Sequence, residues 1–420
     1  MALELIATLV ASLLEIPLRL QPVAAAYLLS LMVEAPKHTL RWAVETAGGS
    51  KSRYSRFLSD HPELARESLI LISRRTARRL AKKKKLLVKG APWTVGIIID
   101  ATIHPRSSVK VRNAQRLNHG EGFVVGHQWT NVMLLIADQE IPLPPIAFLT
   151  KKECRERGAQ YMKEHDRIID YLRNLKLSEW IGQHIPNEVV VITDSGYDSK
   201  KLAKAVVSFG WAWLSALKAC RTAKTARDAE NRTSKWRRID ALFRAVKRPA
   251  PWKTVRIEAN AKRRRKTYRA RSLIGRLKGI PHDLALVCTE KSKKGRRYFA
   301  CSVTELDVGV IVRAYEKRWR IELFHRKTKE QTGMTDAGLV SFDAVTAHVH
   351  WSYCAFLLLH EIETPRPMTL IERQRWLGDL VARSPWVKRL QDVAATRTQY
   401  GGAEVAKRLV AAALQGDAAA

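Results

Sequence analysis

The sequence predicts an α/β protein in which a mixed sheet is flanked by helical segments. Short runs of β-branched and other apolar residues alternate with helical patterns between residues 91 and 220, which is typical of an α/β sheet. Apolar residues also recur at helical spacing before and after this part. At 420 residues the chain is long enough for two or three domains with a buried core.

Residues 1–90 are expected to form a helical domain. Apolar residues recur at helical spacing over 3–33 and 65–80, and the pattern ends in a basic run at 82–85. A small helical domain with basic helices suits DNA binding, although a bundle with a solvated charged face fits the pattern equally well. Charged residues and prolines interrupt the apolar N-terminus and no basic leader precedes it, so we expect core helices, no membrane span and a cytoplasmic protein.

Residues 91–220 are expected to form the sheet. Two β-branched runs each end in an aspartate: TVGIIID reaches Asp100, and NEVVVITD reaches Asp194. Further strands are predicted at 127–137, 141–149 and 211–217, with helices at 153–178 and 198–210. The order of strands, helix, strand, helix and strand predicts a mixed sheet.

Residues 221–303 interrupt this rhythm. They are strongly basic and contain four strand-like pieces, KTVRIEA, TYRARSL, DLALVCT and RRYFACSV, so we expect an inserted, mainly β subdomain. One long helix is expected from Asp307, within a segment 304–335 that returns to the α/β part. Residues 336–420 have helical patterns and are expected to form a C-terminal domain, a candidate for dimerisation.

The charge balance favours an anionic partner. The chain carries 74 Lys and Arg against 40 Asp and Glu, a formal net charge of +34, and the excess is spread along its length. Such a surface opposes self-association and attracts polyanions, so nucleic acid is the first partner to expect. An anionic membrane and a merely solubilising role are the alternatives. The five cysteines show no CxxC spacing, which argues for reduced thiols and against a zinc finger.

Asp100 and Asp194 are candidate metal ligands. Phosphoryl transfer on DNA needs a nucleophile, a stabilised leaving oxygen and a neutralised phosphate charge, and two divalent ions held by carboxylates provide all three. A carboxylate at the end of a buried strand suits this task, because open α/β sheets bind ligands beyond their strand ends. Either aspartate alone is more often a turn or cap residue. The pair, on adjacent strands, favours metal binding.

A third acid is predicted on the helix near residue 320. Tyr315, Arg318, Glu322 and Lys329 are spaced by 3, 4 and 7 residues. At about 100° per residue they fall within about 60° of one another, on one face of one helix. Cations outnumber the single acid, which favours a phosphate-binding surface with one metal ligand. An exposed, salt-bridged helix is the common alternative.

The string around this acid resembles a known family. YEKRWRIELFHRKTK matches the pattern Y-(2)-R-(3)-E-(6)-K of bacterial cut-and-paste insertion-sequence transposases with an Asp-Asp-Glu (DDE) triad. The order of elements is similar too: an aspartate in DATI, another in TDSGYDSKKL, a β-rich insertion, and then the acid on a helix. The resemblance covers residues 94–330 well and the flanking helical parts loosely.

The resemblance implies a ribonuclease-H-like catalytic core in which Asp100, Asp194 and Glu322 hold two Mg²⁺ ions, with Mn²⁺ as a substitute. Tyr315, Arg318 and Lys329 would hold phosphates of the DNA end, and Trp319 would stack near that end. The partners would be double-stranded DNA, both the terminal inverted repeats of the element and the target. A homodimer would pair two ends, in the nucleoid of the cytoplasm.

The remaining candidates are weaker. His325 lies at the edge of the stripe that carries the third acid and is a candidate for contacting DNA or a nucleophilic water. Arg263, Arg264 and Arg265, in the basic run of the insertion, would follow backbone phosphates. A tryptophan of the insertion would pack against a displaced base, with core packing as the alternative for each candidate, Trp236 and Trp252. Three histidines are expected in loops or facing DNA, and two acids at a turn and a helix start: His104, His119, His127, Asp138 and Asp198.

Two other functions stay open. A stand-alone ribonuclease-H-like nuclease, such as a junction resolvase, would need neither the N-terminal helical region nor the β-rich insertion. A non-catalytic DNA-binding protein, such as a domesticated transposase that acts as a regulator, would not need all three acids. The function predicted is therefore metal-dependent cleavage at transposon ends and strand transfer into target DNA, with the second-strand chemistry, hairpin or other, left open.

Overall fold

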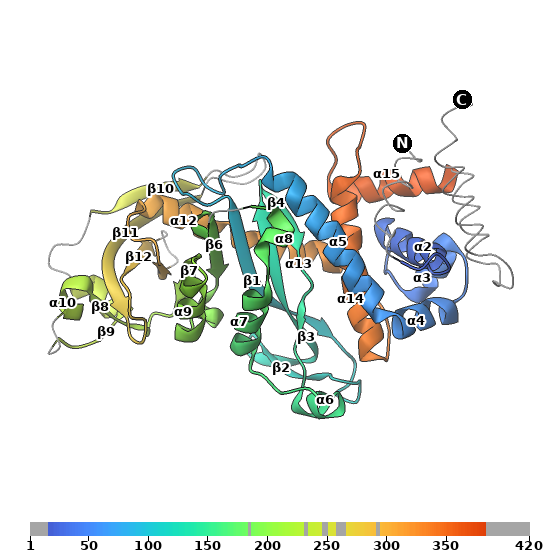
Figure 1. Cartoon of the computed structure of the whole chain (residues 1–420), viewed down its shortest axis with the longest axis horizontal. Coiled ribbons are helices and arrows are strands. Elements are labelled where there is room, and N and C mark those ends of the chain that lie inside the picture. The colour runs from blue at the N-terminus through green and yellow to red at the C-terminus, as the bar shows by residue number, and fades with distance from the viewer. Residues whose placement is uncertain are drawn as a thin grey trace.

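The computed structural model describes residues 16–183, 186–230, 234–245, 251–257, 266–290 and 295–383. Figure 1 shows an elongated molecule, with helices from both ends of the chain on one side, a sheet through the centre, and the strands of the insertion on the other side. Arg263, Arg264 and Arg265 lie outside the described residues. Within the described ranges, no helix combines the length and the apolar character that crossing a membrane requires.

The centre of the sheet is parallel. Its strands β1 (Val95–Pro105), β6 (Val189–Thr193) and β7 (Ala212–Leu217) lie in that order and run in one direction. The apolar runs of β1 and β6 are buried on both faces, as expected for parallel strands covered by helices on either side. The α/β fold class predicted from the sequence is confirmed.

Beyond β1 the sheet becomes antiparallel. β1 pairs with β3 (Gly122–Ile136) along its whole length, whereas its pairing with β6 stops at Ile99. β1 therefore runs on past Asp100, which the sequence analysis placed at a strand end, because β3 continues to supply hydrogen bonds after β6 has turned away. The other strands on this side also pair with β3: β2 (Gln115–His119), β4 (Gln139–Pro142) and β5 (Ile146–Ala147).

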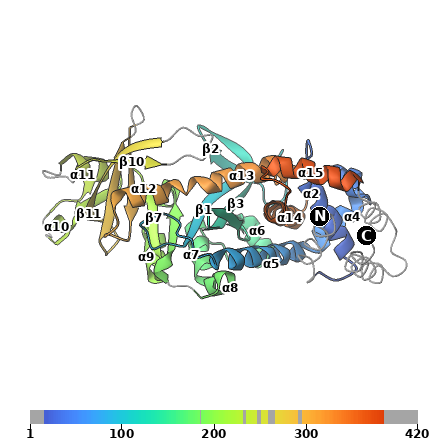
Figure 2. The same ribbon diagram turned by 90° about the horizontal axis from the view of Figure 1, so that it is seen from above.

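Helices cover the two faces of the sheet, as Figure 2 shows. One face carries two helices that follow the insertion: α12 (Val308–Glu316) and α13 (Trp319–Gln331). The other face carries α5 (Pro62–Ala81), α7 (Glu164–Asn174), α8 (Leu177–Ile181) and α9 (Lys200–Ser208). The central strands, among them β1, therefore lie between a helical layer on each side.

The single long helix expected from Asp307 is wrong, because the chain forms α12 and α13 instead. Lys317 and Arg318 keep helical dihedral angles, but their N–H groups donate to residues three positions back, Ala314 and Tyr315, at 3.1 and 2.9 Å. This is one tight 3₁₀ turn, with about three residues per turn in place of 3.6. A helical wheel drawn through the break at a constant angle therefore loses its phase.

The insertion extends the central sheet instead of forming a separate one. Strand β13 (Arg296–Cys301) pairs antiparallel with β7, with Tyr298 opposite Leu217. The sheet then continues outward through β12 (Leu284–Glu290), β11 (Lys266–Leu277), β8 (Thr222–Thr225) and β9 (Arg237–Arg238), and β10 (Lys253–Ile257) pairs with β11. Two short helices lie beside these strands, α10 (Ala226–Glu230) and α11 (Ile239–Ala245). Backbone hydrogen bonds thus connect the basic insertion directly to the strand next to β6.

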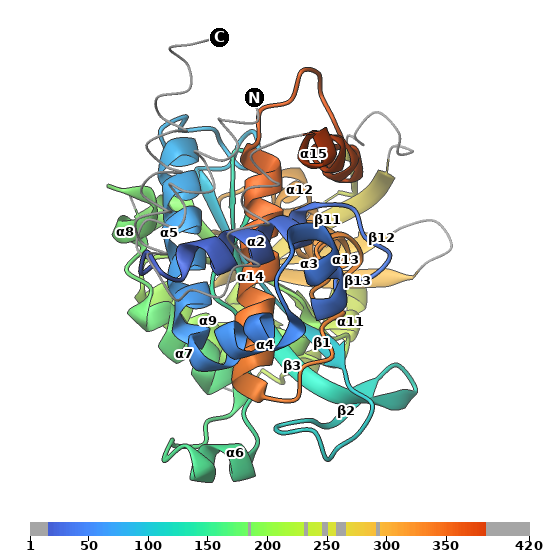
Figure 3. The same ribbon diagram turned by 90° about the vertical axis from the view of Figure 1, so that its right-hand side faces the viewer.

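Helices from the two ends of the chain share one core. α14 (Phe342–Glu361) is buried along almost its whole length, and Figure 3 shows the N-terminal helices gathered around it. The Trp351 ring lies 6.0 Å from that of Phe57, and the hydroxyl of Tyr27 hydrogen-bonds to His348 at 2.6 Å. The other helices of this layer are α2 (Gln21–Met32), α3 (Leu40–Ala47), α4 (Lys51–Asp60) and α15 (Leu370–Arg383).

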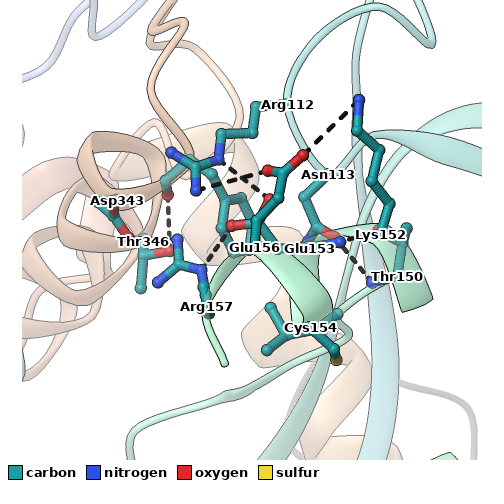
Figure 4. Close-up of polar contacts among 12 residues, drawn as sticks. Arg112, Asn113, Thr150, Lys152, Glu153, Cys154, Glu156, Arg157, Asp343 and Thr346 are labelled. Atoms are coloured by element: carbon teal, nitrogen blue, oxygen red, sulfur yellow. Dashed lines mark hydrogen bonds and ion pairs between the residues drawn. The ribbon is translucent and has the colours of Figure 1, made fainter. Parts of the chain in front are cut away.

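A buried acid joins three segments at the far end of β3. Glu153, on α6 (Lys151–Glu156), is 2% exposed and accepts hydrogen bonds from Arg112, at 3.0 Å, and from Arg157 (Figure 4). Arg157 also donates to Asp343, at the start of α14, at 2.6 Å. The loop before β2, helix α6 and helix α14 are therefore held together by one network of ion pairs.

Candidate active site

Asp100 and Asp194 lie next to each other where β1 and β6 stop pairing. The last pair of the parallel ladder joins Ile99 to Thr193, so each aspartate is the next residue of its chain. Asp194 caps the turn that follows, since its Oδ1 accepts a hydrogen bond from the Gly196 N–H at 2.8 Å. The structure thus brings together the two carboxylates that the sequence analysis took as a pair.

Arg318 links Glu322 to the first aspartate. Its Nη2 donates to Glu322 Oε1, and its Nη1 lies 3.7 Å from Asp100 Oδ2. The Arg318 side chain is only 16% exposed, so both ion pairs are largely shielded from water. The start of α13 therefore carries the third acid to the edge of the sheet where the two aspartates meet.

The carboxyl of Asp100 is short of positive charge. Burial raises the pKa of Asp100 to about 7, and the charges of Asp194 and Glu322 add to that rise, while Arg318 and the Ala101 N–H act against it. A further cation would favour the ionised form. Three carboxylates are also the hard oxygen ligands that Mg²⁺ prefers, so the chemistry of these donors fits a divalent cation.

The carboxylates are not gathered on a single point. Within the described ranges, no three His, Cys, Asp or Glu side chains lie close enough to hold one metal ion. The Arg318 guanidinium lies between Asp100 and Glu322 and neutralises both. The three carboxylates are of a type that suits a divalent cation. In the present side-chain conformation Arg318 supplies the positive charge next to Asp100 and Glu322.

Tyr315 and Lys329 lie on either side of this cluster. Tyr315, on α12, is 9% exposed, with its ring 4.3 Å from that of Phe299 and 6.0 Å from the Arg318 guanidinium. Burial raises the pKa of Tyr315 to about 12, so its hydroxyl stays protonated at neutral pH. Lys329 follows Glu322 by two turns of α13, and burial lowers the pKa of its ammonium group. Tyr315 and Arg318 thus meet across the helix break.

Two adjoining cavities open beside the acids. One, of about 270 Å³, lies between the insertion and the start of α13, and the other, of about 320 Å³, reaches Asp194. Tyr315 and Arg318 line both. The side chains that the insertion contributes were missed by sequence reasoning, because long-range strand pairing places them here and no local motif marks them: Lys266, Tyr268, Arg296 and Arg297.

Trp319 lies at the mouth of the smaller cavity. It is 39% exposed, and the Lys266 ammonium group lies 6.0 Å from its ring centre. Glu316 holds this wall in place by accepting hydrogen bonds from Lys266 and from the Tyr268 hydroxyl, both at 2.8 Å. An exposed aromatic face with cations around it is a surface on which a nucleotide base can stack.

His325 is buried, which argues against the prediction that it contacts DNA or a nucleophilic water. It is 8% exposed, and its Nε2 accepts a hydrogen bond from the Asn131 amide at 2.9 Å. The helical wheel placed His325 only about 60° from Glu322 on the same helix, and its burial against Asn131 could not be read from that spacing. Two other histidines expected in loops or facing DNA are also buried, at 1% exposure each: His104 and His127. The side chain of His119 lies outside the described residues.

Neither tryptophan of the insertion lines the two cavities. The ring of Trp252 packs against the guanidinium groups of Arg269 and Arg271, at 5.1 and 4.7 Å. Trp236 is 39% exposed, with Lys224 at 5.0 Å from its ring. Core packing is therefore the better account of Trp252, and neither ring lies where it would meet a base held beside the acids.

Asp138 connects a lysine-rich turn to the start of α13. It lies in the turn between β3 and β4, as expected, with a φ of 65°. Lys85 lies 3.3 Å from its carboxylate, and Lys317 donates a hydrogen bond to it. The exposed lysines that precede Lys85 are thereby held close to the helix that carries Glu322. Asp198 precedes α9 and pairs with Arg221 at 3.4 Å.

The fold and the site together define a class of protein. A mixed sheet with aspartates side by side on adjacent parallel strands, and a glutamate brought to them by a helix, is typical of ribonuclease-H-like domains. The sequence model of the transposase DDE domain family matches residues 94–358, more than half of the chain, so the chain belongs to that family. It is a transposase, whose substrate is DNA and whose family uses divalent metal ions. Among curated proteins, none matches the chain.

Proposed function

We propose that the protein is a cut-and-paste transposase of the Y-(2)-R-(3)-E-(6)-K group, which cleaves DNA at the ends of its element and joins them to target DNA. The observations that support the proposal are that Asp100 and Asp194 follow the last paired residues of adjacent parallel strands, and that Arg318 pairs with both Asp100 and Glu322. Acids bridged by an arginine, in a chain with a net charge of +34, suit a reaction on phosphodiesters.

In this proposal Asp100, Asp194 and Glu322 hold two Mg²⁺ ions, for which Mn²⁺ can substitute. Such ions, when bound, activate water, stabilise the leaving oxygen and neutralise phosphate charge. The chain supplies the carboxylates on two adjacent strands and a helix, a frame that holds them at fixed separations. No covalent protein–DNA intermediate is needed in this proposal, because water and then the freed 3′-OH would be the nucleophiles and Tyr315 would be a phosphate contact.

The proposed DNA contacts surround the acids. Tyr315, Arg318 and Lys329 would grip phosphates of the DNA end, and Trp319 would stack on a base beside the cavity that it lines. The insertion would follow the DNA backbone with its basic residues, among them Arg263, Arg264 and Arg265. Contacts of this kind position the DNA without reading its sequence.

The proposed partners are the terminal inverted repeats and the target DNA, bound in the nucleoid by a homodimer that brings two ends together. α14 is buried within its own chain, so the dimer is inferred from the need to pair two ends and not from that helix. The proposed domains are a DNA-binding domain 1–90, a catalytic core 91–220 and 304–335, an insertion 221–303 and a C-terminal domain 336–420.

The test is cleavage of double-stranded DNA that carries the inverted repeats flanking the gene. Glu322→Gln is expected to abolish Mg²⁺-dependent cleavage and strand transfer, while end binding in a gel-shift assay stays within about twofold of wild type. Glu330→Gln, an exposed glutamate on the same helix, should cleave as wild type does. Unchanged cleavage by Glu322→Gln would contradict the assigned site, and cleavage without joining to target DNA would indicate a stand-alone nuclease.

A further inference from the structure

A buried polar chain connects α14, β3 and α13 beside the acids. The Tyr353 hydroxyl donates a hydrogen bond to Asn131 Oδ1 at 2.7 Å, and Asn131 Nδ2 donates to His325 Nε2 at 2.9 Å. Tyr353 is 0% exposed, Asn131 1% and His325 8%. Polar groups this deeply buried destabilise a fold unless their hydrogen bonds are made. This row of hydrogen bonds therefore strongly restrains the relative positions of α14, β3 and α13.

Asn131 occupies the position of β3 that faces Asp100 of β1. The two residues are register partners in the antiparallel ladder, and the side chains of such partners share a face of the sheet, about 5 Å apart. His325 follows Glu322 by three residues, nearly one turn of α13. The Asn131–His325 bond therefore ties α13 to the sheet one position from the first aspartate and one turn from the third acid.

The bond has a defined direction. Because the Tyr353 hydroxyl bonds to Oδ1, the Asn131 amide nitrogen faces His325, whose Nε2 must accept without a proton. Burial lowers the pKa of His325 to about 3, with Lys329 and Arg318 acting in the same direction. The imidazole therefore stays neutral at physiological pH, and the acceptor is always present.

Other polar contacts hold the two ends of α13, where Arg320 pairs with Glu140 at 3.3 Å and Thr332 hydrogen-bonds to Ser352 at 2.7 Å. Ile321 and Phe324 bury apolar side chains, with the Phe324 ring 4.8 Å from the Tyr353 ring, and apolar contacts tolerate small rotations and slides. At a reacting centre, a displacement of about 1 Å can cost about 100-fold in rate.

We propose that Tyr353, Asn131 and His325 are positioning residues that hold α13 at the rotation and height at which Glu322 meets Asp100. None of the three touches DNA or metal, and they act only through Glu322. This inference rests on the proposed function, since it takes Glu322 to belong to the catalytic set. It also gives α14, through Tyr353, a part in the site that the sequence did not indicate.

His325→Leu and His325→Gln form the decisive pair of variants. Leucine leaves the Asn131 amide unpaired, whereas glutamine offers a carbonyl acceptor of similar reach. With leucine, kcat for cleavage of terminal-repeat DNA should fall about 10-fold or more while KM stays within about twofold. Binding of Mn²⁺ alone, followed by electron paramagnetic resonance, should weaken about 10-fold. Glutamine should restore both quantities to near their wild-type values.

Ser352→Ala is the matched control. The Ser352 and Thr332 hydroxyls share a buried hydrogen bond of 2.7 Å between α14 and the end of α13, one residue from Tyr353. Its removal should cost about 1 kcal/mol of stability, close to the cost of Tyr353→Phe. Because Ser352→Ala leaves the Asn131–His325 bond intact, kcat and Mn²⁺ binding should not change.

Three results would overturn the inference: wild-type kcat and Mn²⁺ binding in His325→Leu, a loss that glutamine does not reverse, or an equal loss in Ser352→Ala. If the leucine variant does not fold, Tyr353→Phe takes its place. We then expect kcat to fall about threefold with weaker Mn²⁺ binding, and unchanged values would again overturn the inference. If the proposed function itself is wrong, the results differ: wild type does not cleave, and Glu322→Gln binds Mn²⁺ normally. That outcome would overturn the proposed function and the positioning role together.

Discussion

Replacing Glu153 with alanine should destabilise the protein by about 3 kcal/mol. The Glu153 carboxylate is 2% exposed and accepts hydrogen bonds from Arg112 and Arg157, as Figure 4 shows, and each charge-assisted bond contributes about 1.5–3 kcal/mol. The two arginine side chains are 45% and 32% exposed, so solvent screens them and the lower end of the range applies. At about 2.1 cal/mol/K of unfolding entropy for each of the 420 residues, the midpoint of thermal unfolding should fall by about 3 °C.

Circular dichroism during heating measures this effect, with Glu156→Ala as the control. Glu156 is on the same helix but 44% exposed, with partners at 3.9 and 3.8 Å, so its loss should shift the midpoint by less than about 1 °C. Equal midpoint shifts in the two variants would contradict the prediction, because the expected difference between them comes from the burial of the Glu153 carboxylate.

The same pair of proteins tests the pH dependence. Burial alone would raise the pKa of Glu153, but the hydrogen bonds from Arg112 and Arg157 outweigh burial and hold that pKa below 4.5. A lowered pKa gives stability that is present above the unfolded-state value and is lost as the pH falls through the folded-state value. The midpoints of wild type and Glu153→Ala should therefore differ fully at pH 6 and converge as the pH falls below 4.5. A difference that grows on acidification would contradict this assignment.

Three further predictions concern DNA. Tyr315→Phe should keep measurable cleavage with no protein–DNA adduct on a denaturing gel, because water is the proposed nucleophile and Tyr315 a phosphate contact. Complete loss of cleavage, with an adduct in wild type, would identify a tyrosine nucleophile. Trp319→Ala should weaken terminal-DNA binding by about 1–3 kcal/mol in a gel shift, whereas Trp252→Ala should lower the unfolding midpoint and leave DNA binding intact. If Trp252→Ala weakened DNA binding and Trp319→Ala did not, the stacking site would lie in the insertion. Lys83→Gln with Lys84→Gln should reduce the slope of log K against log salt by about 0.9 per lost phosphate contact, and an unchanged slope would exclude the lysine turn from the DNA path.

The fold class and the two aspartates could be predicted because local patterns specify them. A β-branched run followed by an acid identifies Asp100 and Asp194 separately, and parallel strands of one sheet bring such ends together. The position of Glu322 also followed from a short motif. In each case the residues that matter are close in sequence, or one rule of sheet topology joins them.

The rest of the site depends on contacts that are distant in sequence. The 3₁₀ turn at Lys317 and Arg318 has no glycine or proline to mark it, so the sequence predicted one helix. The burial of His325 depends on Asn131, almost two hundred residues earlier in the chain. Tyr268 and Arg297 reach the cavities only because β11, β12 and β13 pair with one another and extend the sheet from β7.

The shared core of the two chain ends has a consequence for synthesis. The helices α2, α4 and α5 emerge from the ribosome before the sheet, but α14, the helix around which they gather, is made only after the sheet and the insertion. Until then their apolar side chains, such as Tyr27 and Phe57, have no central partner to bury against. A product that ends before α14 would therefore lack both the completed helical layer and the Tyr353 hydroxyl behind the acids, so that assembly of the active protein waits for this helix.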